Sequence, residues 1–564
     1  PQQPLRVMVS SSADAGAVAV ALFDPSGTRH LPRTRLLGGP PYTYWAEQPT
    51  PREGTWTAVL GDGERILACE QIEVRGHRGG LRRHEADVDP AWQSVWRWDE
   101  DTENLYAAFV EQLFAPTVEG QREAPPEEST WPNLSVLVRD PARNLLHDHF
   151  GAHEDDRIRL RPDCADLPYF LRAYFAWKLR LPFAFRACGR GADGQPPACD
   201  VTPQHNQQAV PGTDEVNAFQ EFSRVVAGTV HSASARTHPD SNATDVYPVP
   251  LARESLLPGT VFADPYGHLL IIARWVPQTA TEYGVLIGAD AQPDGTVALR
   301  RFWRGSFLFS PDTSAAGAGF KAFRPLRARR EGMLTRRNDE ITAAPRAWSR
   351  QQYTGTADDF YDRMEALINP RPLEPLGQLR VLVDALDESA QRRVVSVDNG
   401  EQHMRSHPGT RIEMPEGYAV FETAGDWEDF ATPSRDMRLL ISIDAVLGFP
   451  ESVLRQPARF GVSASEARTV AAQLRAELQT LLAARAITYV RSDGAPQRVT
   501  LAELVERKTA FEMAYNPNDC VETRWGAPAG SPEAQSCQRR APPEQAQRMA
   551  RYREWFARRQ RPAR

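Results

Sequence analysis

A single cysteine directly before a long apolar run is the feature that most constrains this chain. Cys164 lies in Asp163-Cys164-Ala165-Asp166, and residues 167–177 are almost entirely apolar and aromatic. We expect this run to form a helix that begins near the cysteine. The first turn of a helix carries unpaired N–H groups and a partial positive charge, which favour a thiolate over a thiol. Cys164 is therefore a candidate nucleophile.

A single histidine stands in a similar position before a second apolar run. His268 ends the sequence Tyr266-Gly267-His268, and the residues 269–272 that follow it predict a strand. A histidine beside a cysteine can take the thiol proton and later return it. We predict that Cys164 is the nucleophile and His268 the base. The alternative is that the cysteine is a buried structural thiol and the histidine a loop residue.

These motifs resemble the NlpC/P60 family of papain-like cysteine peptidases, which cut the stem peptides of peptidoglycan. The resemblance rests on an Asp-Cys-small pattern before an aromatic helix, on residues 258–262 (PGTVF), and on the histidine motif with its strand. It covers roughly residues 130–330, about the length of one domain. Two features depart from the family. Ala165-Asp166 replaces the usual Ser-Gly, and the cysteine and histidine are 104 positions apart, which an insertion would explain.

The resemblance implies a third residue, which orients the imidazole from the strand after the histidine strand. Residues 284–292 predict that strand, and a Pro-Asp-Gly turn follows at 293–295. Asp290 and Gln292 are two positions apart and so share one face. We predict Asp290 as the orienting residue, with Gln292 as its substitute. Both could instead be polar residues that lead into the turn. The backbone N–H of Cys164 is a candidate oxyanion donor.

Composition excludes several classes of protein. The chain has 564 residues, of which 41% are hydrophobic and 25% charged, with a net charge of −7. These values are typical of folded multidomain proteins, and they favour neither a disordered chain nor a nucleic-acid-binding protein. No run approaches the roughly 18 apolar residues of a membrane span. We expect no cofactor and no metal. The start at Pro1, without methionine, fits a mature form whose signal segment has been removed.

The cysteines predict two short disulfides. Four of the six flank loops that contain glycine or proline: Cys188 with Cys199, and Cys520 with Cys537. Pairing them would leave Cys69 and Cys164 free, and disulfides indicate an oxidising compartment. We therefore predict a periplasmic or secreted bacterial protein. Cys69 lies in an alternating segment, 66–74, where we expect a small buried strand residue.

Patterns along the chain predict an α+β, multidomain protein. Strand-like runs separated by turns fill the N-terminal residues. A helical pattern begins at Asp89, and Ser463 with Glu466 predicts a capping box before a C-terminal helix. Residues 379–383 and 437–443 look like strands. The predicted units are an Ig-like β-sandwich (1–78), a helical linker (79–130), a papain-like NlpC/P60-type catalytic domain (131–330), a mixed α/β region (331–450) and a helical C-terminal region (451–564).

Three further patterns carry weaker signals. The Gly-x-Gly-x-x-Gly match at 189–194 lies between two cysteines and cannot open a helix, so we interpret it as a loop. The acidic and histidine cluster at 147–154 fits no standard zinc spacing. Residues 548–564 hold seven arginines and one acid. They predict a docked helix with Met549, Tyr552 and Phe556 on its inner face; the alternative is attraction to an anionic envelope surface.

The sequence favours an exported cysteine hydrolase that acts on an amide bond, with a peptidoglycan peptide as the substrate that the resemblance implies. A non-catalytic cell-envelope binding or scaffold protein that retains the fold is the main alternative. A thiol-dependent acyl or amide transferase is a third.

Overall fold

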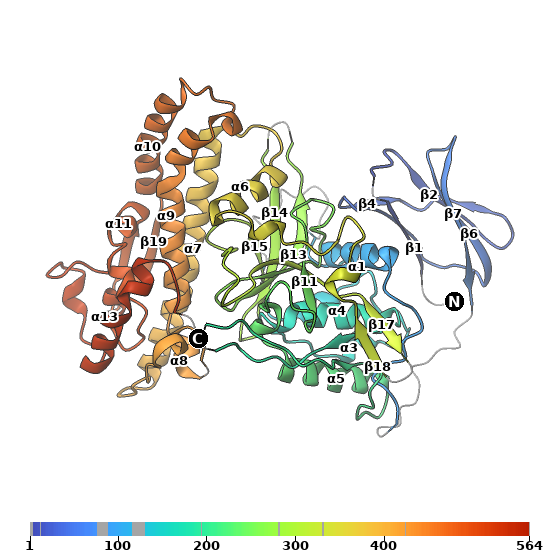
Figure 1. Cartoon of the computed structure of the whole chain (residues 1–564), viewed down its shortest axis with the longest axis horizontal. Helices are drawn as coiled ribbons and strands as arrows, with labels where there is room; N and C mark the ends of the chain where they lie inside the picture. The colour runs from blue at the N-terminus through green and yellow to red at the C-terminus, as the bar shows by residue number, and fades with distance from the viewer. Residues whose placement is uncertain are drawn as a thin grey trace.

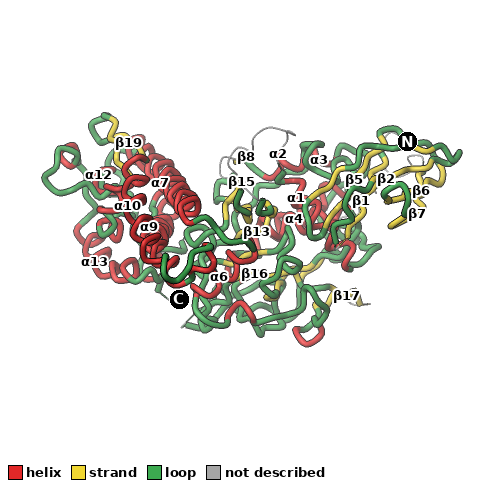
Figure 2. The backbone as a smooth tube through the Cα atoms, turned by 90° about the horizontal axis from the view of Figure 1, so that it is seen from above, coloured by secondary structure: helices red, strands yellow, loops and turns green. Residues whose placement is uncertain are grey.

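The computed structural model describes residues 4–11, 13–75, 88–115, 130–192, 194–279, 282–329, 332–423 and 425–562. It is a mixed α+β structure with three parts that follow one another along the long axis (Figures 1 and 2). An N-terminal β part lies at one end and a helical part at the other. The central part is built on a seven-stranded sheet.

Two small antiparallel sheets form the N-terminal part and share one apolar core. Trp56 and Leu60 of one sheet and Tyr44 of the other are buried in that core. The strand expected at 66–74 is confirmed. Cys69 is exposed, however, because it lies on the outer face of an edge strand, so the expectation of a buried cysteine is wrong. The strands are β1 (Leu5–Ser11), β5 (Tyr42–Gln48) and β4 (Arg35–Leu37) in one sheet, and β3 (Arg29–His30), β2 (Ala19–Phe23), β6 (Gly54–Gly61) and β7 (Ile66–Val74) in the other.

The helix expected from Asp89 begins only at Glu100, as α1 (Glu100–Leu113). Asp99 and Thr102 form a capping box that fixes this start. Trp92 lies in the irregular segment before it, buried, with its indole N–H donating to the carbonyl of Leu181. The capping box therefore sets a later start than the predicted one. Residues 79–87 and 116–129 of the predicted linker lie outside the described residues.

The central sheet is antiparallel throughout. Its order is β11-β16-β12-β13-β14-β15-β8. Alternate residues of β13 serve two cores: Ile271 faces the core that contains helices α1, α4 and α5, and Leu270 faces the core that contains α6. This strand is buried on both faces, which explains its uninterrupted apolar sequence. The strands are β11 (Val246–Pro248), β16 (Gly319–Phe323), β12 (Val261–Ala263), β13 (Leu269–Val276), β14 (Val285–Ala291), β15 (Val297–Arg301) and β8 (Thr130–Trp131).

Helices and short hairpins surround this sheet. The predicted helix after Cys164 is confirmed. The elements are α2 (Leu134–Val138), α3 (Glu154–Arg157), α4 (Asp166–Lys178), α5 (Glu215–Thr229) and α6 (Ala357–Ile368), with two hairpins, β9 (Ala184–Phe185) with β10 (Gln204–His205) and β17 (Leu326–Arg329) with β18 (Gly332–Thr335).

In the C-terminal part, helices replace the two strands that we expected at 379–383 and 437–443. The two strand-like runs lie inside long helices, α7 (Pro375–Ser406) and α9 (Pro433–Arg455). Their buried positions recur every three or four residues, as Leu379, Val383 and Leu386 do in α7, and a five-residue window is too short to reveal this period. The capping box of Ser463 and Glu466 is confirmed. The remaining elements are α8 (Asp426–Phe430), α10 (Ala467–Ala484), α11 (Leu501–Glu506), α12 (Val521–Arg524), α13 (Pro543–Ala557) and a hairpin of β19 (Ala486–Val490) and β20 (Pro496–Thr500).

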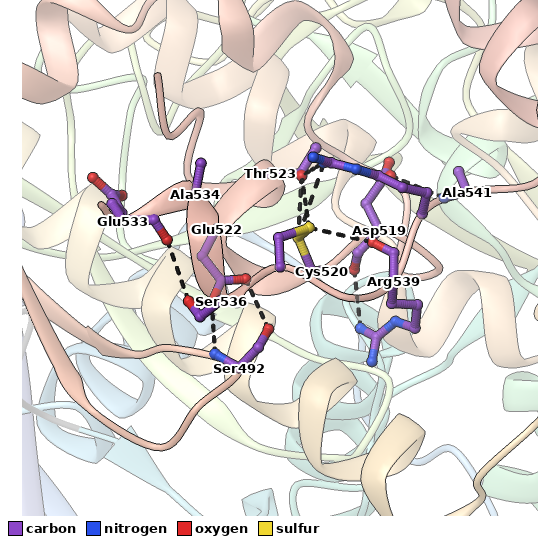
Figure 3. The surroundings of a disulfide bond; sticks show 12 residues. Ser492, Asp519, Cys520, Glu522, Thr523, Glu533, Ala534, Ser536, Arg539 and Ala541 are labelled. Atoms are coloured by element: carbon purple, nitrogen blue, oxygen red, sulfur yellow. Dashed lines mark hydrogen bonds between the residues drawn. A yellow bond between two sulfur atoms is a disulfide. The ribbon is translucent and has the colours of Figure 1, made fainter. Parts of the chain in front are cut away.

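Both predicted disulfides are present, Cys188–Cys199 and Cys520–Cys537. Figure 3 shows the second, beside Glu522, which accepts hydrogen bonds from Ser492 and Ser536.

Among the helices of the described segments, none combines the length and apolar character that a membrane crossing needs.

Candidate active site

All four residues predicted for the site line one cavity of about 270 Å³: Cys164, His268, Asp290 and Gln292. The central sheet forms one wall, and residues of α7, α9 and the chain end form the other. Residues that are far apart in the sequence therefore meet at the junction of two parts of the molecule. Cys164 and His268, which we predicted to act together, both line this cavity.

Cys164 lies in the turn just before α4, where its neighbours occupy the helix N-terminus. The Asp163 carboxylate accepts hydrogen bonds from the backbone N–H groups of Ala165 and Asp166, at 2.7 and 2.9 Å. The unpaired N–H groups that we expected to favour a thiolate are thus already bound to a carboxylate. The Cys164 sulfur instead accepts a hydrogen bond from the backbone N–H of Leu269, the residue after His268.

Burial is the main cause that raises the pKa of the Cys164 thiol, to about 12. The carboxylates of Asp163, Asp290 and Asp166 raise the pKa further, and the N–H of Leu269 opposes them only in part. The expectation of a thiolate is wrong for the protein without substrate, because three acidic groups and burial outweigh the helix N-terminus. The sulfur is held as a thiol.

A tight turn between β12 and β13 presents His268. The backbone N–H of Asp264 donates to the carbonyl of His268 at 2.8 Å, which closes the turn. Gly267 has a φ of +107°, a conformation that side-chain-bearing residues rarely adopt. Arg561, near the chain end, donates to the carbonyl of Tyr266 and lies over its ring. The C-terminal segment therefore contacts the turn that carries the imidazole.

Asp290 holds the imidazole from the neighbouring strand. Its carboxylate is 3% exposed and lies 3.0 Å from Nε2 of His268. Burial opposes ionisation, but Arg300 and the hydrogen bond from His268 keep the pKa of Asp290 below its usual value. An ionised carboxylate only accepts hydrogen bonds, so Nε2 must donate and Nδ1 is the nitrogen left to act as a base.

Gln292 and Arg300 support Asp290. The Gln292 amide donates to Oδ2 of Asp290 at 3.2 Å, and Arg300 Nε donates to the same atom at 3.1 Å. Gln292 thus contacts the orienting carboxylate and not the imidazole. We predicted that Gln292 could take the place of Asp290 in orienting the imidazole. In the structure it instead donates a hydrogen bond to Asp290. No sequence motif had singled out Arg300, whose place follows only from the pairing of β15 with β14.

The sequence also gave no sign that the helical part would reach this cavity. Its side chains approach from α7, from α9 and from the segments between and after them. Their convergence depends on how two distant parts of the chain pack. The polar and aromatic members include Arg392, Arg393, Trp427, Ser434, Arg435 and Arg438.

The other sequence patterns have structural roles. Glu154 of the 147–154 cluster and the following residue Asp155 form buried ion pairs with Lys178. Asp148, the other acid of the cluster, accepts a hydrogen bond from the backbone N–H of His153. Among the described residues, the group whose atoms lie close enough to hold a metal is Cys520, Glu522 and Cys537, but its two cysteines form a disulfide. The 189–194 glycine pattern belongs to the Cys188–Cys199 loop, and Asp193 lies outside the described residues.

The basic C-terminal segment docks as predicted. Met549 and Phe556 of α13 are buried in the core of the helical part, and Tyr552 packs against it. Arg553 and Arg559 pair with Glu512 and Asp444. The prediction of a docked helix is confirmed. Attraction of its outer face to an anionic surface stays a prediction.

No family model, curated protein or solved structure matches this chain. The resemblance to the NlpC/P60 family therefore stays a prediction from the short motifs around Cys164 and His268.

Proposed function

We propose that this protein is a papain-like cysteine hydrolase of amide bonds, with a peptidoglycan stem peptide as the substrate. Cys164 is the nucleophile, His268 the base and Asp290 the residue that orients the imidazole. The observation that carries the proposal is the arrangement around the cavity. A cysteine and a histidine line it together, and Asp290 fixes the histidine so that Nδ1 is its free acceptor. The choice of substrate follows from the motif resemblance.

The residues define a complete reaction. The Cys164 sulfur attacks the amide carbonyl carbon, and its proton passes to Nδ1 of His268. The imidazolium then protonates the leaving nitrogen, the C–N bond breaks, and an acyl thioester remains on the sulfur. Water loses a proton to His268 and attacks this thioester. The C–S bond breaks, the carboxylic acid product leaves, and the imidazolium returns its proton to the sulfur.

The raised pKa of Cys164 determines how the first step occurs. Since the sulfur is a thiol at neutral pH, its proton must transfer to His268 as the S–C bond forms. The ionised Asp290 stabilises the imidazolium that this transfer creates. The mechanism is therefore general-base catalysis and does not use a preformed thiolate–imidazolium pair.

Two disulfides support an exported location. Disulfides form and persist in oxidising compartments such as the bacterial periplasm or the exterior of the cell. Peptidoglycan lies in the same compartments, so the location and the substrate are consistent.

One observation favours a second function, that of a non-catalytic envelope-binding protein. Asp163 and Asp166 flank Cys164 and disfavour its thiolate, which is the opposite of what a reactive cysteine needs. In that case the cavity would bind a peptide without cleaving it.

Hydrolysis of purified peptidoglycan and stem peptides, followed by chromatography of the fragments, tests the proposal. Cys164→Ala and His268→Ala should each lower turnover by roughly a thousandfold or more, with unchanged thermal melting. Cys69→Ala, which removes the other free cysteine, is the matched control and should retain full activity. Activity that survives Cys164→Ala would exclude the mechanism. An inactive wild type that still binds the peptides would favour the binding function.

A further inference from the structure

The cavity beside Cys164 is strongly basic. Six arginines line it, against two carboxylates, Asp290 and Glu428. Arg300 comes from β15, Arg392 and Arg393 from α7, Arg435 and Arg438 from α9, and Arg561 from the C-terminal segment. A hydrolase site needs no such excess of positive charge for the bond-breaking steps, which use a thiol, an imidazole and one carboxylate.

Five of these arginines are held by other groups of the protein. The pairs are Arg300 with Asp290, Arg393 with Asp436, Arg438 with Asp264, Arg392 with the hydroxyl of Ser389, and Arg561 with the carbonyl of Tyr266. These arginines serve the structure of the cavity wall. The Arg393–Asp436 pair, for example, is bidentate and almost fully buried.

Arg435 differs from the other five. Its side chain makes no hydrogen bond or ion pair with any described residue, although Asp436 is its neighbour in the chain, because that carboxylate is bound to Arg393. The guanidinium is half-buried, and burial is the main cause that lowers its pKa. The charge of Asp436 opposes this effect, Arg300 and Arg438 add to it, and Asp290 again opposes it. The hydrogen bonds that Asp436 and Asp290 accept come from other residues, so the N–H donors of Arg435 are available to an anionic ligand that enters the cavity.

The backbone around Arg435 suits the same ligand. Arg435 lies in the first turn of α9, a helix of 23 residues whose N-cap residue, Thr432, makes no side-chain capping bond. Pro433 and Ser434, in that first turn, also line the cavity. The positive end of a long helix and a free guanidinium thus meet at one point of the wall opposite the catalytic groups.

We infer that Arg435 binds a carboxylate of the substrate next to the scissile amide, an inference that rests on the proposed function. A guanidinium binds a carboxylate through two parallel hydrogen bonds, which fixes orientation as well as position. The helical part therefore supplies substrate selectivity: it admits peptides that carry a free carboxylate and discriminates against the same peptides when that carboxylate is amidated. Arg435 is a binding residue and takes no part in proton transfer.

Binding measured in the Cys164→Ala background separates this inference from catalysis. The probes are the stem peptide whose D-glutamate carries a free α-carboxylate and the same peptide with that carboxylate amidated. By calorimetry, the parent variant should bind the carboxylate peptide roughly tenfold or more tightly than the amidated one. Adding Arg435→Ala should abolish this preference, and Arg435→Lys should restore part of it. Arg468→Ala is the matched control, because Arg468 is an exposed arginine in the first turn of α10.

The outcomes distinguish the two proposals. Equal binding of both peptides by the parent variant, binding of neither, or a preference that survives Arg435→Ala would overturn the role of Arg435. If the wild type cleaves these peptides while Arg435→Ala changes neither KM nor the preference, the hydrolase proposal stands and the inference fails. If the preference depends on Arg435 but the wild type cleaves nothing, the inference stands and the hydrolase proposal fails.

Discussion

Nε2 of His268, in the turn before β13, donates to Oδ2 of Asp290 on the neighbouring strand β14 across 3.0 Å. The same carboxylate oxygen accepts from Gln292 and Arg300. Asp290 is therefore fixed by three donors, and the imidazole is fixed by Asp290. This arrangement sets the tautomer of His268 and explains why a buried carboxylate stays ionised.

Replacement of Asp290 by Asn should lower kcat/KM by roughly 10²–10⁴-fold, because an amide no longer stabilises the imidazolium or enforces donation from Nε2. Gln292→Ala is the matched comparison. Gln292 contacts the carboxylate and not the imidazole, so its loss should cost less than about tenfold. Steady-state kinetics on a stem peptide measure both. Equal losses of kcat/KM in the two variants would show that the hydrogen bond between Asp290 and His268 does not contribute to catalysis.

Alkylation should distinguish the two free cysteines. Since the pKa of Cys164 is raised to about 12, its thiolate fraction at pH 8 is about one in ten thousand. Iodoacetamide should therefore label the exposed Cys69 well before Cys164 in the protein without substrate. Labelling of Cys164 should rise about tenfold for each pH unit between pH 7 and 10, without a plateau. Mass spectrometry of digested samples resolves the two sites. A plateau near neutral pH would indicate a stable thiolate and contradict the assignment of a thiol.

The turn that carries His268 should not tolerate a side chain at Gly267. Its φ of +107° is unfavourable for alanine, and an added Cβ would approach Oε1 of Glu422 to 2.9 Å. We expect Gly267→Ala to lower activity at least tenfold through displacement of the imidazole. Gly63→Ala is the matched control, since Gly63 has a similar φ of +98° in a distant hairpin and meets nothing within 4 Å. Both variants should lower the free energy of unfolding by a similar amount. An equal loss of activity in both would show that Gly267→Ala does not act by displacing His268.

Local sequence patterns predicted the elements that present the chemistry, but not the wall that faces them. The apolar runs after Cys164 and His268 form α4 and β13 because each is buried in a core, and burial produces an unbroken apolar sequence. The charge state of Cys164 could not be predicted, because Leu269 of β13 and Asp290 of β14 act on the sulfur, and both are distant from it in the sequence. No sequence pattern indicated that Arg435 would line the cavity either. An isolated arginine at the start of a helix is common, and only tertiary packing places this one opposite the catalytic groups.

The pH dependence of stability should report the buried carboxyl of Asp166. Burial, and secondly the charge of Asp163, raise the pKa of Asp166 from 3.8 to about 7. Between these values the unfolded chain has lost this proton while the folded protein still holds it, so stability falls as pH rises. The stabilisation by the protonated group is complete below about pH 4 and is lost as pH passes about 7. Asparagine imitates the protonated form and can still accept the hydrogen bond from the N–H of Asp163.

Asp166→Asn should therefore melt at the same temperature as the wild type at pH 4 and about 2–4 °C higher at pH 8. Asp101→Asn, in the first turn of α1, is an exposed control and should melt in parallel with the wild type at both values. The same Asp166 variant removes one of the charges that raise the pKa of Cys164, so its alkylation at pH 8 should be faster than in the wild type. If the difference in melting temperature between Asp166→Asn and the wild type were the same at pH 4 and pH 8, the pKa of Asp166 would not be raised in the folded protein. Unaltered alkylation would mean that Asp166 does not raise the pKa of Cys164. In that case burial and the carboxylates of Asp163 and Asp290 would account for the protonated sulfur.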